Sequence, residues 1–100
     1  MIKYLRSART QAGKHREAVQ WAKEVADWLN THQPGANVQV FTEVFGAPGT
    51  LYWLGDAEDL ATIERQTAER QSAADWQALT ARGAELLLPG SLRDTLLRSA

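Results

Sequence analysis

A chain of 100 residues, of which 44% are hydrophobic and 23% charged, is long enough for one folding unit and too short for two. We therefore predict a single domain over residues 1–100. The formal net charge of −1 excludes the broad positive surface of proteins that bind nucleic acid or anionic membranes. The absence of cysteine excludes disulfides, thiolate nucleophiles and cysteine metal sites.

The N-terminal segment MIKYLRSART predicts a first strand, with Ile2, Tyr4 and Arg6 on one face and Lys3 and Leu5 on the other. It lacks the basic segment and following apolar run of a secretion signal. No apolar stretch in the chain reaches the length of about 18 residues that a membrane span needs. We therefore expect a cytoplasmic protein without a membrane span.

An amphipathic helix is predicted between about Gly13 and His32. Its apolar face is formed by residues at three- and four-residue spacing, namely Ala18, Trp21, Ala22, Val25, Trp28, Leu29 and His32. Pro34 and Gly35 then end the helix, because proline lacks the amide proton that a helix interior needs and restricts the residue before it.

A β-hairpin is predicted over residues 38–54, where VQVFTEVF and TLYWLG flank the turn sequence GAPG. Alternation gives it two apolar faces, one with Val38, Val40, Val44, Leu51 and Trp53 and the other with Phe41, Phe45, Tyr52 and Leu54. A loop of even length pairs Phe45 with Thr50, Glu43 with Tyr52, and Phe41 with Leu54, whereas a loop of three or five residues changes this pairing. We expect the helices to pack on the first of these faces.

Two further helices and a last strand are predicted after the hairpin. The second helix begins at the capping residue Asp56 and has a thin apolar stripe of Leu60, Ile63 and Thr67. The third follows Ser72, where SAAD resembles a capping box, and its apolar face is Trp76, Leu79 and Gly83. The arginines of this region alternate with Glu64, Glu69 and Asp75, as on a solvated surface. Residues 91–99 fit either strand or helix spacing, and we predict a strand because it completes a four-stranded sheet.

This element order predicts an α+β fold, the ferredoxin-like β-α-β-β-α-(α)-β subunit, in which an antiparallel sheet carries its helices on one face. A chain of this length cannot also cover the second apolar face of the hairpin. A two-fold copy of the same chain is the commonest partner for such a face, so we expect a homodimer.

The phrase EVFGAPGTLYWLGDAEDLATIE, the pair Asp75 and Trp76, and the later PGSLRDTLLR resemble the dimeric α/β-barrel proteins, particularly their NIPSNAP-like members. The resemblance implies that two sheets face each other as a barrel and that each subunit encloses a pocket between its sheet and its helices or loops. It implies no single activity, because the superfamily includes cofactor-free monooxygenases, haem-degrading enzymes, isomerases and members without assigned chemistry.

Glu43 beside Tyr52 has two interpretations. The pair could supply an acid and a proton donor in a partly enclosed pocket, or it could be a cross-strand hydrogen bond that satisfies both groups. Tyr4 and Arg6 are further candidates, because a buried arginine without a carboxylate could meet an anionic ligand. The predicted ligand site therefore comprises Tyr4, Arg6, Phe41, Glu43, Tyr52 and Leu54, with Glu43 and Tyr52 as catalytic candidates.

The tryptophans and histidines favour structural interpretations. Trp21, Trp28 and Trp53 lie on predicted core faces, and Trp76 is predicted as core rather than pocket wall. His15 and His32 are 17 residues apart on one helix and so lie on different faces. We expect no metal site and no cofactor, with His32 as a packed residue at the helix end and the only candidate for a haem ligand.

Three functions remain open at the level of the sequence. The first is a homodimer that binds a small, mostly apolar molecule in a pocket beside the sheet. The second is a cofactor-independent monooxygenase or isomerase, with Glu43 as base and Tyr52 or Arg6 stabilising an enolate-like charge. The third is a structural or regulatory dimer whose interlocked sheets leave no pocket.

Overall fold

The protein is described by a computed structural model that covers all residues, 1–100. The elements in chain order are β1 (Ile2–Arg9), α1 (His15–His32), β2 (Gln39–Thr42), β3 (Thr50–Ala57), α2 (Leu60–Gln71), α3 (Ala74–Gly83) and β4 (Arg93–Arg98). This β-α-β-β-α-α-β order confirms the predicted ferredoxin-like α+β fold. None of the helices has the length and apolarity that crossing a membrane requires.

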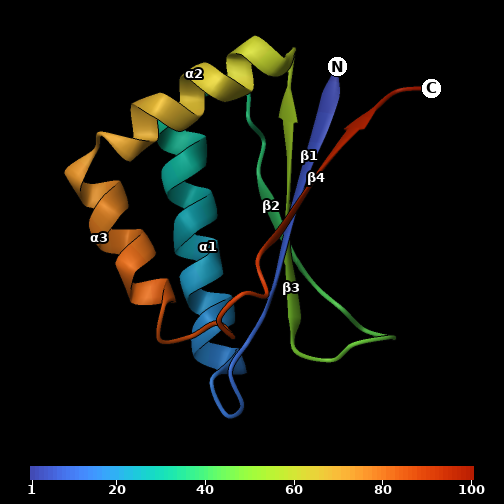
Figure 1. Cartoon of the computed structure of the whole chain (residues 1–100), viewed down its shortest axis with the longest axis vertical. Coiled ribbons are helices and arrows are strands. Elements are labelled where there is room, and N and C mark those ends of the chain that lie inside the picture. Colours follow the sequence, from blue (N-terminus) through green and yellow to red (C-terminus); the bar gives the residue numbers. More distant parts are fainter.

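The four strands form one antiparallel sheet in the order β2-β3-β1-β4. The last segment is therefore a strand, as predicted, and it pairs with the free edge of β1. All three helices lie on one side of the sheet, and the other side carries no covering element (Figure 1). We call the uncovered side the open face.

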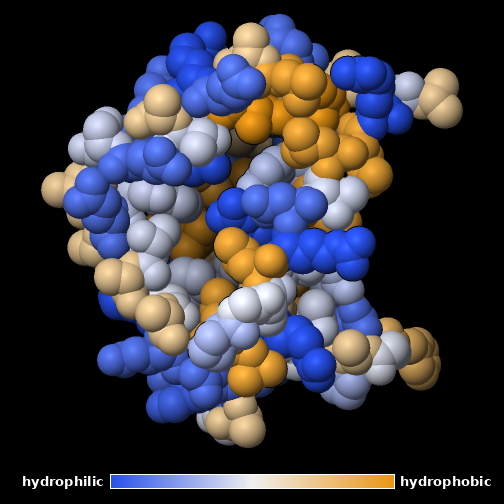
Figure 2. Space-filling model, viewed as in Figure 1, coloured by the Kyte–Doolittle hydropathy of each residue, from blue (hydrophilic) through white to orange (hydrophobic).

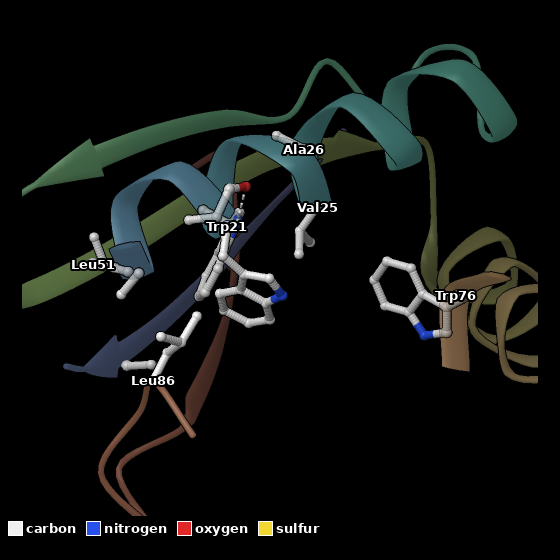
Figure 3. Close-up of a cluster of buried hydrophobic side chains, with 10 residues drawn as sticks. Trp21, Val25, Ala26, Leu51, Trp76 and Leu86 are labelled. Carbon is white, nitrogen blue, oxygen red and sulfur yellow. Dashed lines mark hydrogen bonds between the residues drawn. The ribbon is translucent and has the colours of Figure 1, made fainter. Parts of the chain in front are cut away.

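The helix-facing side holds the core, because alternate residues of β1 and β3 meet the apolar stripe of α1. Ala8, Leu51 and Trp53 from the strands pack against α1 residues that include Trp21 and Val25 (Figure 3). Trp21 and Trp53 meet edge to face with ring centroids 5.7 Å apart. Both indole N–H groups are satisfied, that of Trp53 by the Ala22 carbonyl at 3.0 Å and that of Trp21 by the Leu79 carbonyl at 2.8 Å. The predicted core positions of these tryptophans are thus confirmed.

The predicted register of the hairpin is wrong by two residues. Phe41 pairs with Tyr52, rather than Glu43, and Gln39 pairs with Leu54. The strand β2 ends at Thr42, and the residues up to Gly49 form a longer loop in which Val44 and Phe45 are exposed instead of lying on strand faces. Directly after β2, the carboxylate of Glu43 folds back and accepts a hydrogen bond from the Ala47 amide, which holds the loop in this shape.

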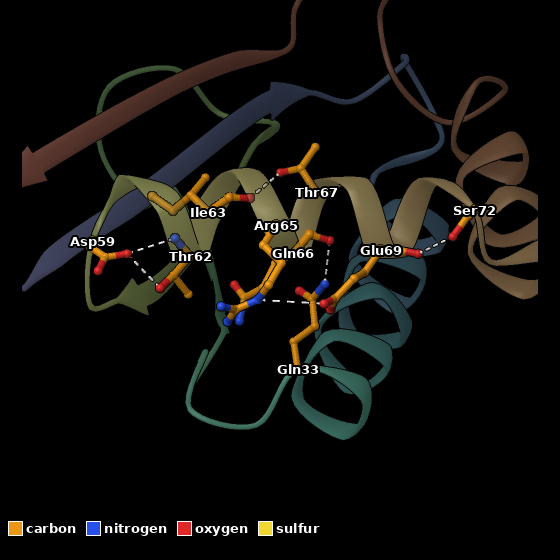
Figure 4. Close-up of polar contacts among 9 residues, drawn as sticks. All are labelled: Gln33, Asp59, Thr62, Ile63, Arg65, Gln66, Thr67, Glu69 and Ser72. Atoms are coloured by element: carbon orange, nitrogen blue, oxygen red, sulfur yellow. Dashed lines mark hydrogen bonds and ion pairs between the residues drawn. The ribbon is translucent and has the colours of Figure 1, made fainter.

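The predicted starts of the second and third helices are also wrong. Asp56 lies inside β3 and pairs with Lys3, with Nζ and Oδ1 2.5 Å apart. The cap of α2 is Asp59, whose carboxylate accepts hydrogen bonds from the amide and hydroxyl of Thr62 (Figure 4). The strand pairing of β3 with β1 continues to Ala57, so it delays the helix by one turn. Ser72 ends α2, donating to the Glu69 carbonyl, and makes no cap for α3.

His32 is exposed, contrary to the prediction that it is packed into the buried stripe. Its ring stacks on Trp28 with centroids 4.1 Å apart, and Nδ1 lies 2.9 Å from the Trp28 carbonyl oxygen. The chain turns at the end of α1, so that the next residue, Gln33, takes the buried place instead.

Candidate functional site

A pocket with a volume of about 100 Å³ lies between the helix-facing side of the sheet and the three helices. Figure 2 shows it as a hollow with hydrophobic atoms inside and hydrophilic atoms around its opening. The apolar part of its wall includes Trp21, Val25, Leu29, Val38, Trp53, Ile63 and Trp76. Because a dry cavity of about 150 Å³ encloses benzene, this smaller pocket would enclose only part of a ring or short chain, and the rest of the molecule would lie in its opening.

Trp76 at the start of α3 is both core and pocket wall. Only 8% of its surface is exposed, which confirms the predicted burial. Its ring nevertheless stands apart from Trp21, Leu51 and Leu86 (Figure 3) and borders the pocket. Trp28 packs on it with centroids 4.8 Å apart, and the Trp28 indole N–H donates to Asp75 at 2.8 Å. This contact fixes the start of α3 against α1 and so positions the pocket wall.

The helix α2 lines the pocket with Ile63, Gln66 and Arg70, which recur at three- and four-residue spacing. None of the side chains of α2 is buried. Its main polar tie to the core is the buried Gln33, whose amide N–H donates to the Gln66 carbonyl oxygen at 2.8 Å (Figure 4). The helix therefore covers the pocket without being packed into the core.

Arg6 of β1 forms a two-point ion pair with Asp94 of β4, which is its direct partner across the strands. Nε lies 2.6 Å from Oδ1 and Nη2 lies 2.9 Å from Oδ2, and the Tyr4 hydroxyl donates to Oδ1 at 3.2 Å. The hydrogen bonds from Arg6 hold the pKa of Asp94 below its ordinary value, and the same hydrogen bonds raise the pKa of Arg6. Burial is the main cause that raises the pKa of Tyr4. Tyr4 and Arg6 of this cluster line the pocket, and Asp94 holds the Arg6 guanidinium from behind that wall.

Replacing Asp94 by Asn is expected to reduce stability at neutral pH by about 1 kcal/mol at most, because the side chain of Asp94 is 44% exposed and the pair is partly screened by water. The lowered pKa of Asp94 means that the pair stabilises the fold fully above the ordinary aspartate value of 3.8. That contribution is lost as the pH falls through the lower, folded-state pKa. Urea unfolding of both proteins between neutral and acidic pH checks this: their stability difference should vanish in acid, and a constant difference would contradict the assignment.

Arg70 reaches the same region from α2. Its guanidinium carbon lies 5.5 Å from the centroid of the Trp76 ring, and the residue is half-buried. It makes no ion pair and no side-chain hydrogen bond within the chain. Burial lowers the pKa of Arg70, and the nearby positive charge of Arg6 adds to that effect.

Glu43 and Tyr52 do contact each other, although the register differs from the predicted one. The Tyr52 hydroxyl donates to the Glu43 carboxylate, which also accepts from the Ala47 amide. The hydrogen bond from Tyr52 lowers the pKa of Glu43, and the same bond raises the pKa of Tyr52. A carboxylate held in this way is a weaker base, and its geometry is that of a brace for the loop.

The six predicted site residues fall on opposite sides of the sheet. Tyr4 and Arg6 line the pocket. Phe41, Tyr52 and Leu54 lie on the open face, with Glu43 bonded to Tyr52 there. The structure thus brings together two separate groups rather than one site.

Sequence reasoning missed Asp94, Gln66 and Arg70. The signal for Asp94 was its place on a strand beside Arg6, which becomes visible only when the register of β1 and β4 is known. Arg70 was assigned to a solvated surface, although it shares a helix face with Ile63.

No group of three or more His, Cys, Asp or Glu side chains is arranged to hold a metal ion. His15 is exposed, and its Nδ1 lies 3.2 Å from the Thr10 hydroxyl. His32 is stacked on Trp28 outside the pocket wall. Neither histidine therefore faces the pocket, as a haem ligand would have to.

No sequence-family model matches the chain, and a comparison with curated proteins finds no match. Solved structures are similar over its whole length. An uncharacterised NIPSNAP domain protein from Burkholderia xenovorans superposes with a TM-score of 0.85 at 21% identity, covering 100% of this chain and 95% of that one. A NIPSNAP family protein from Agrobacterium tumefaciens gives 0.85 at 18% identity, covering 99% and 92% of the two chains.

A structure of an antibiotic biosynthesis monooxygenase is also similar, with a TM-score of 0.74 at 12% identity and coverage of 100% and 99%. These likenesses concern the fold. The chain has the ferredoxin-like fold of NIPSNAP domain proteins, so the resemblance read from its sequence is confirmed at that level.

Proposed function

We propose that this protein, built on the fold shared with NIPSNAP domain proteins, binds a small, mostly apolar molecule in the pocket between its sheet and its helices. The observation that carries this proposal is the pocket wall, in which Trp21, Trp53 and Trp76 surround a space open to solvent. Concave apolar sites with a few polar groups at the opening are typical of small-molecule sites.

We also propose that the open face pairs with a second copy of the chain. Phe41 and Leu97 on this face are 47% and 48% exposed, and Phe45 in the adjoining loop is 91% exposed. The loop between β2 and β3 extends away from the helices, on the side where a partner would lie (Figure 1). A self-complementary apolar sheet face is the kind of surface that two-fold symmetry covers. The pocket is on the other side of the sheet, so pairing would leave it open, which argues against a dimer without a pocket.

A cofactor-independent monooxygenase or isomerase is the second candidate, and the likeness to an antibiotic biosynthesis monooxygenase favours it. The groups that would act in this pocket are Tyr4 and Arg6, which could stabilise negative charge developing on a bound ring. Glu43 would not serve as the base, because its carboxylate is bonded to Tyr52 on the opposite side of the sheet.

The test is to titrate the protein with propylbenzene and to monitor the indole N–H signals in ¹H–¹⁵N NMR spectra. Ile63→Trp should fill the pocket from α2 and weaken binding at least about tenfold, a change of about 1.4 kcal/mol. Leu60→Trp is the matched control, since Leu60 is 47% exposed on the same helix and does not line the pocket.

In the unsubstituted protein, the signals of Trp21, Trp53 and Trp76 should shift more than that of Trp28, which does not line the pocket. Equal binding by all three proteins would place the compound elsewhere and contradict the proposed function.

A further inference from the structure

We propose that the ligand of this pocket is an amphiphilic monoanion, such as a monocarboxylate with an apolar ring or chain, and that Arg70 binds its charged group. This inference rests on the proposed function and names the class of ligand. It assigns a binding role to a residue that the sequence places on a solvated surface.

Arg70 differs from the other arginines of the chain in its surroundings. Arg6 is half-buried but paired with Asp94. The remaining arginines are all exposed, and two of them are paired as well, Arg65 with Glu69 and Arg82 with Glu24. Arg70 is therefore the one half-buried arginine without a carboxylate partner. A half-buried charge without a partner is costly, and a bound anion would remove that cost.

The charges at the pocket opening leave one positive charge in excess. Arg6 and Arg70 contribute two, and Asp94 contributes one negative charge, which Arg6 engages at two points. Asp56 also borders the pocket, but its carboxylate is bound to Lys3. The pKa of Arg70 is lowered mainly by burial, and the nearby Tyr4 and Asp94 oppose that shift without pairing directly with the guanidinium. One excess charge matches a monoanion rather than a dianion.

The hydrogen-bond donors that are still free at the pocket opening favour a ligand group with oxygen acceptors. A guanidinium has five N–H donors, and Asp94 takes two of those on Arg6. The side-chain amide of Gln66, one turn before Arg70, lines the pocket and makes no hydrogen bond within the chain. A carboxylate at this opening would thus find several donors, while Trp53 and Trp76 would receive its apolar part.

The test compares two ligands with the same apolar body, 3-phenylpropionate and its neutral analogue 3-phenylpropionamide, by isothermal titration calorimetry at one salt concentration. The unsubstituted protein should bind the carboxylate about tenfold or more tightly than the amide, as expected for hydrogen bonds between charged groups. Arg70→Met keeps the apolar stem, and it should abolish this preference, so that the carboxylate and the amide bind with equal affinity.

Arg65→Met is the control, because Arg65 is exposed on the same helix and does not line the pocket. It should keep the preference, and Arg70→Lys should keep part of it. Equal affinities for the two compounds in the unsubstituted protein, or a preference that survives in Arg70→Met, would overturn the inference and leave the proposed apolar pocket standing. Binding of neither compound, together with no response to propylbenzene, would contradict the proposed function itself.

Discussion

Trp53→Ala is expected to lower the free energy of unfolding by about 3–5 kcal/mol, as large-to-small changes of buried aromatic residues do. Trp53 is 4% exposed in the middle of β3, and its ring meets Trp21 edge to face. Its indole N–H is also the partner of the Ala22 carbonyl inside α1. The substitution removes the largest of the strand side chains that pack against α1, and it leaves the Ala22 carbonyl without the indole donor.

Urea unfolding at a fixed protein concentration measures this effect, since pairing of subunits would make stability depend on concentration. Leu60→Ala is the control, because Leu60 is 47% exposed on the helical side of the sheet and its replacement should change the stability by no more than about 0.5 kcal/mol. A cost below about 1 kcal/mol for Trp53→Ala would show that the core is not where we place it.

The double substitution Phe41→Glu with Leu54→Glu is expected to convert the proposed dimer to monomers. Both residues lie on the open face, at the direct partners Phe41–Tyr52 and Leu5–Leu54. Two unpaired carboxylates per subunit would have to be buried when the faces meet, and each such burial costs several kcal/mol. Sedimentation velocity should show a mass of two chains for the unsubstituted protein and of one chain for the variant.

Leu60→Glu is the matched control for charge, since Leu60 is as exposed as Phe41 but starts α2 on the helical side. It should leave the dimer intact. An unchanged sedimentation mass for the double variant, or a monomeric unsubstituted protein, would contradict pairing through the open face. The monomeric variant should still bind propylbenzene, because the pocket is built within one subunit.

The element order and the core could be predicted because they follow from spacing. Trp21 and Val25 recur with the period of a helix, and Trp53 lies on the strand face that such a helix must cover. The last strand has only weak alternation. It could be predicted because β1 would otherwise lack a partner on one edge, and β4 does pair there.

The helix and loop boundaries could not be predicted, because more than one side chain near each boundary can form the hydrogen bonds that end a strand or begin a helix. Asp56 and Asp59 are both acceptable caps, and the continued pairing of β3 with Ile2 selects the later one. In the hairpin, the Glu43 carboxylate accepts hydrogen bonds from the Ala47 amide and the Tyr52 hydroxyl, and these stabilise a loop longer than the predicted one. Both outcomes depend on tertiary contacts that a local pattern does not contain.

For a similar reason, the sequence could not show that the predicted site residues lie on two opposite sides of the sheet. Alternation assigns Arg6 to one face of β1 and Tyr52 to one face of β3, but only the pairing of Arg6 with Trp53 shows that these faces are opposite. The role of Arg70 depends on the distance between α2 and Trp76, which no sequence spacing records.

The lack of buried side chains on α2 has a consequence for how a ligand would enter. Displacing this helix removes no buried side chain from the core, so its local opening is expected to cost far less than opening of β1 or β3. Transient separation of α2 from the sheet would therefore admit a molecule without disturbing the strands that form the open face. A ligand that contacts both Arg70 and the tryptophans would restrain this separation of α2 from the sheet. Binding would therefore make α2 more rigid than it is in the free protein.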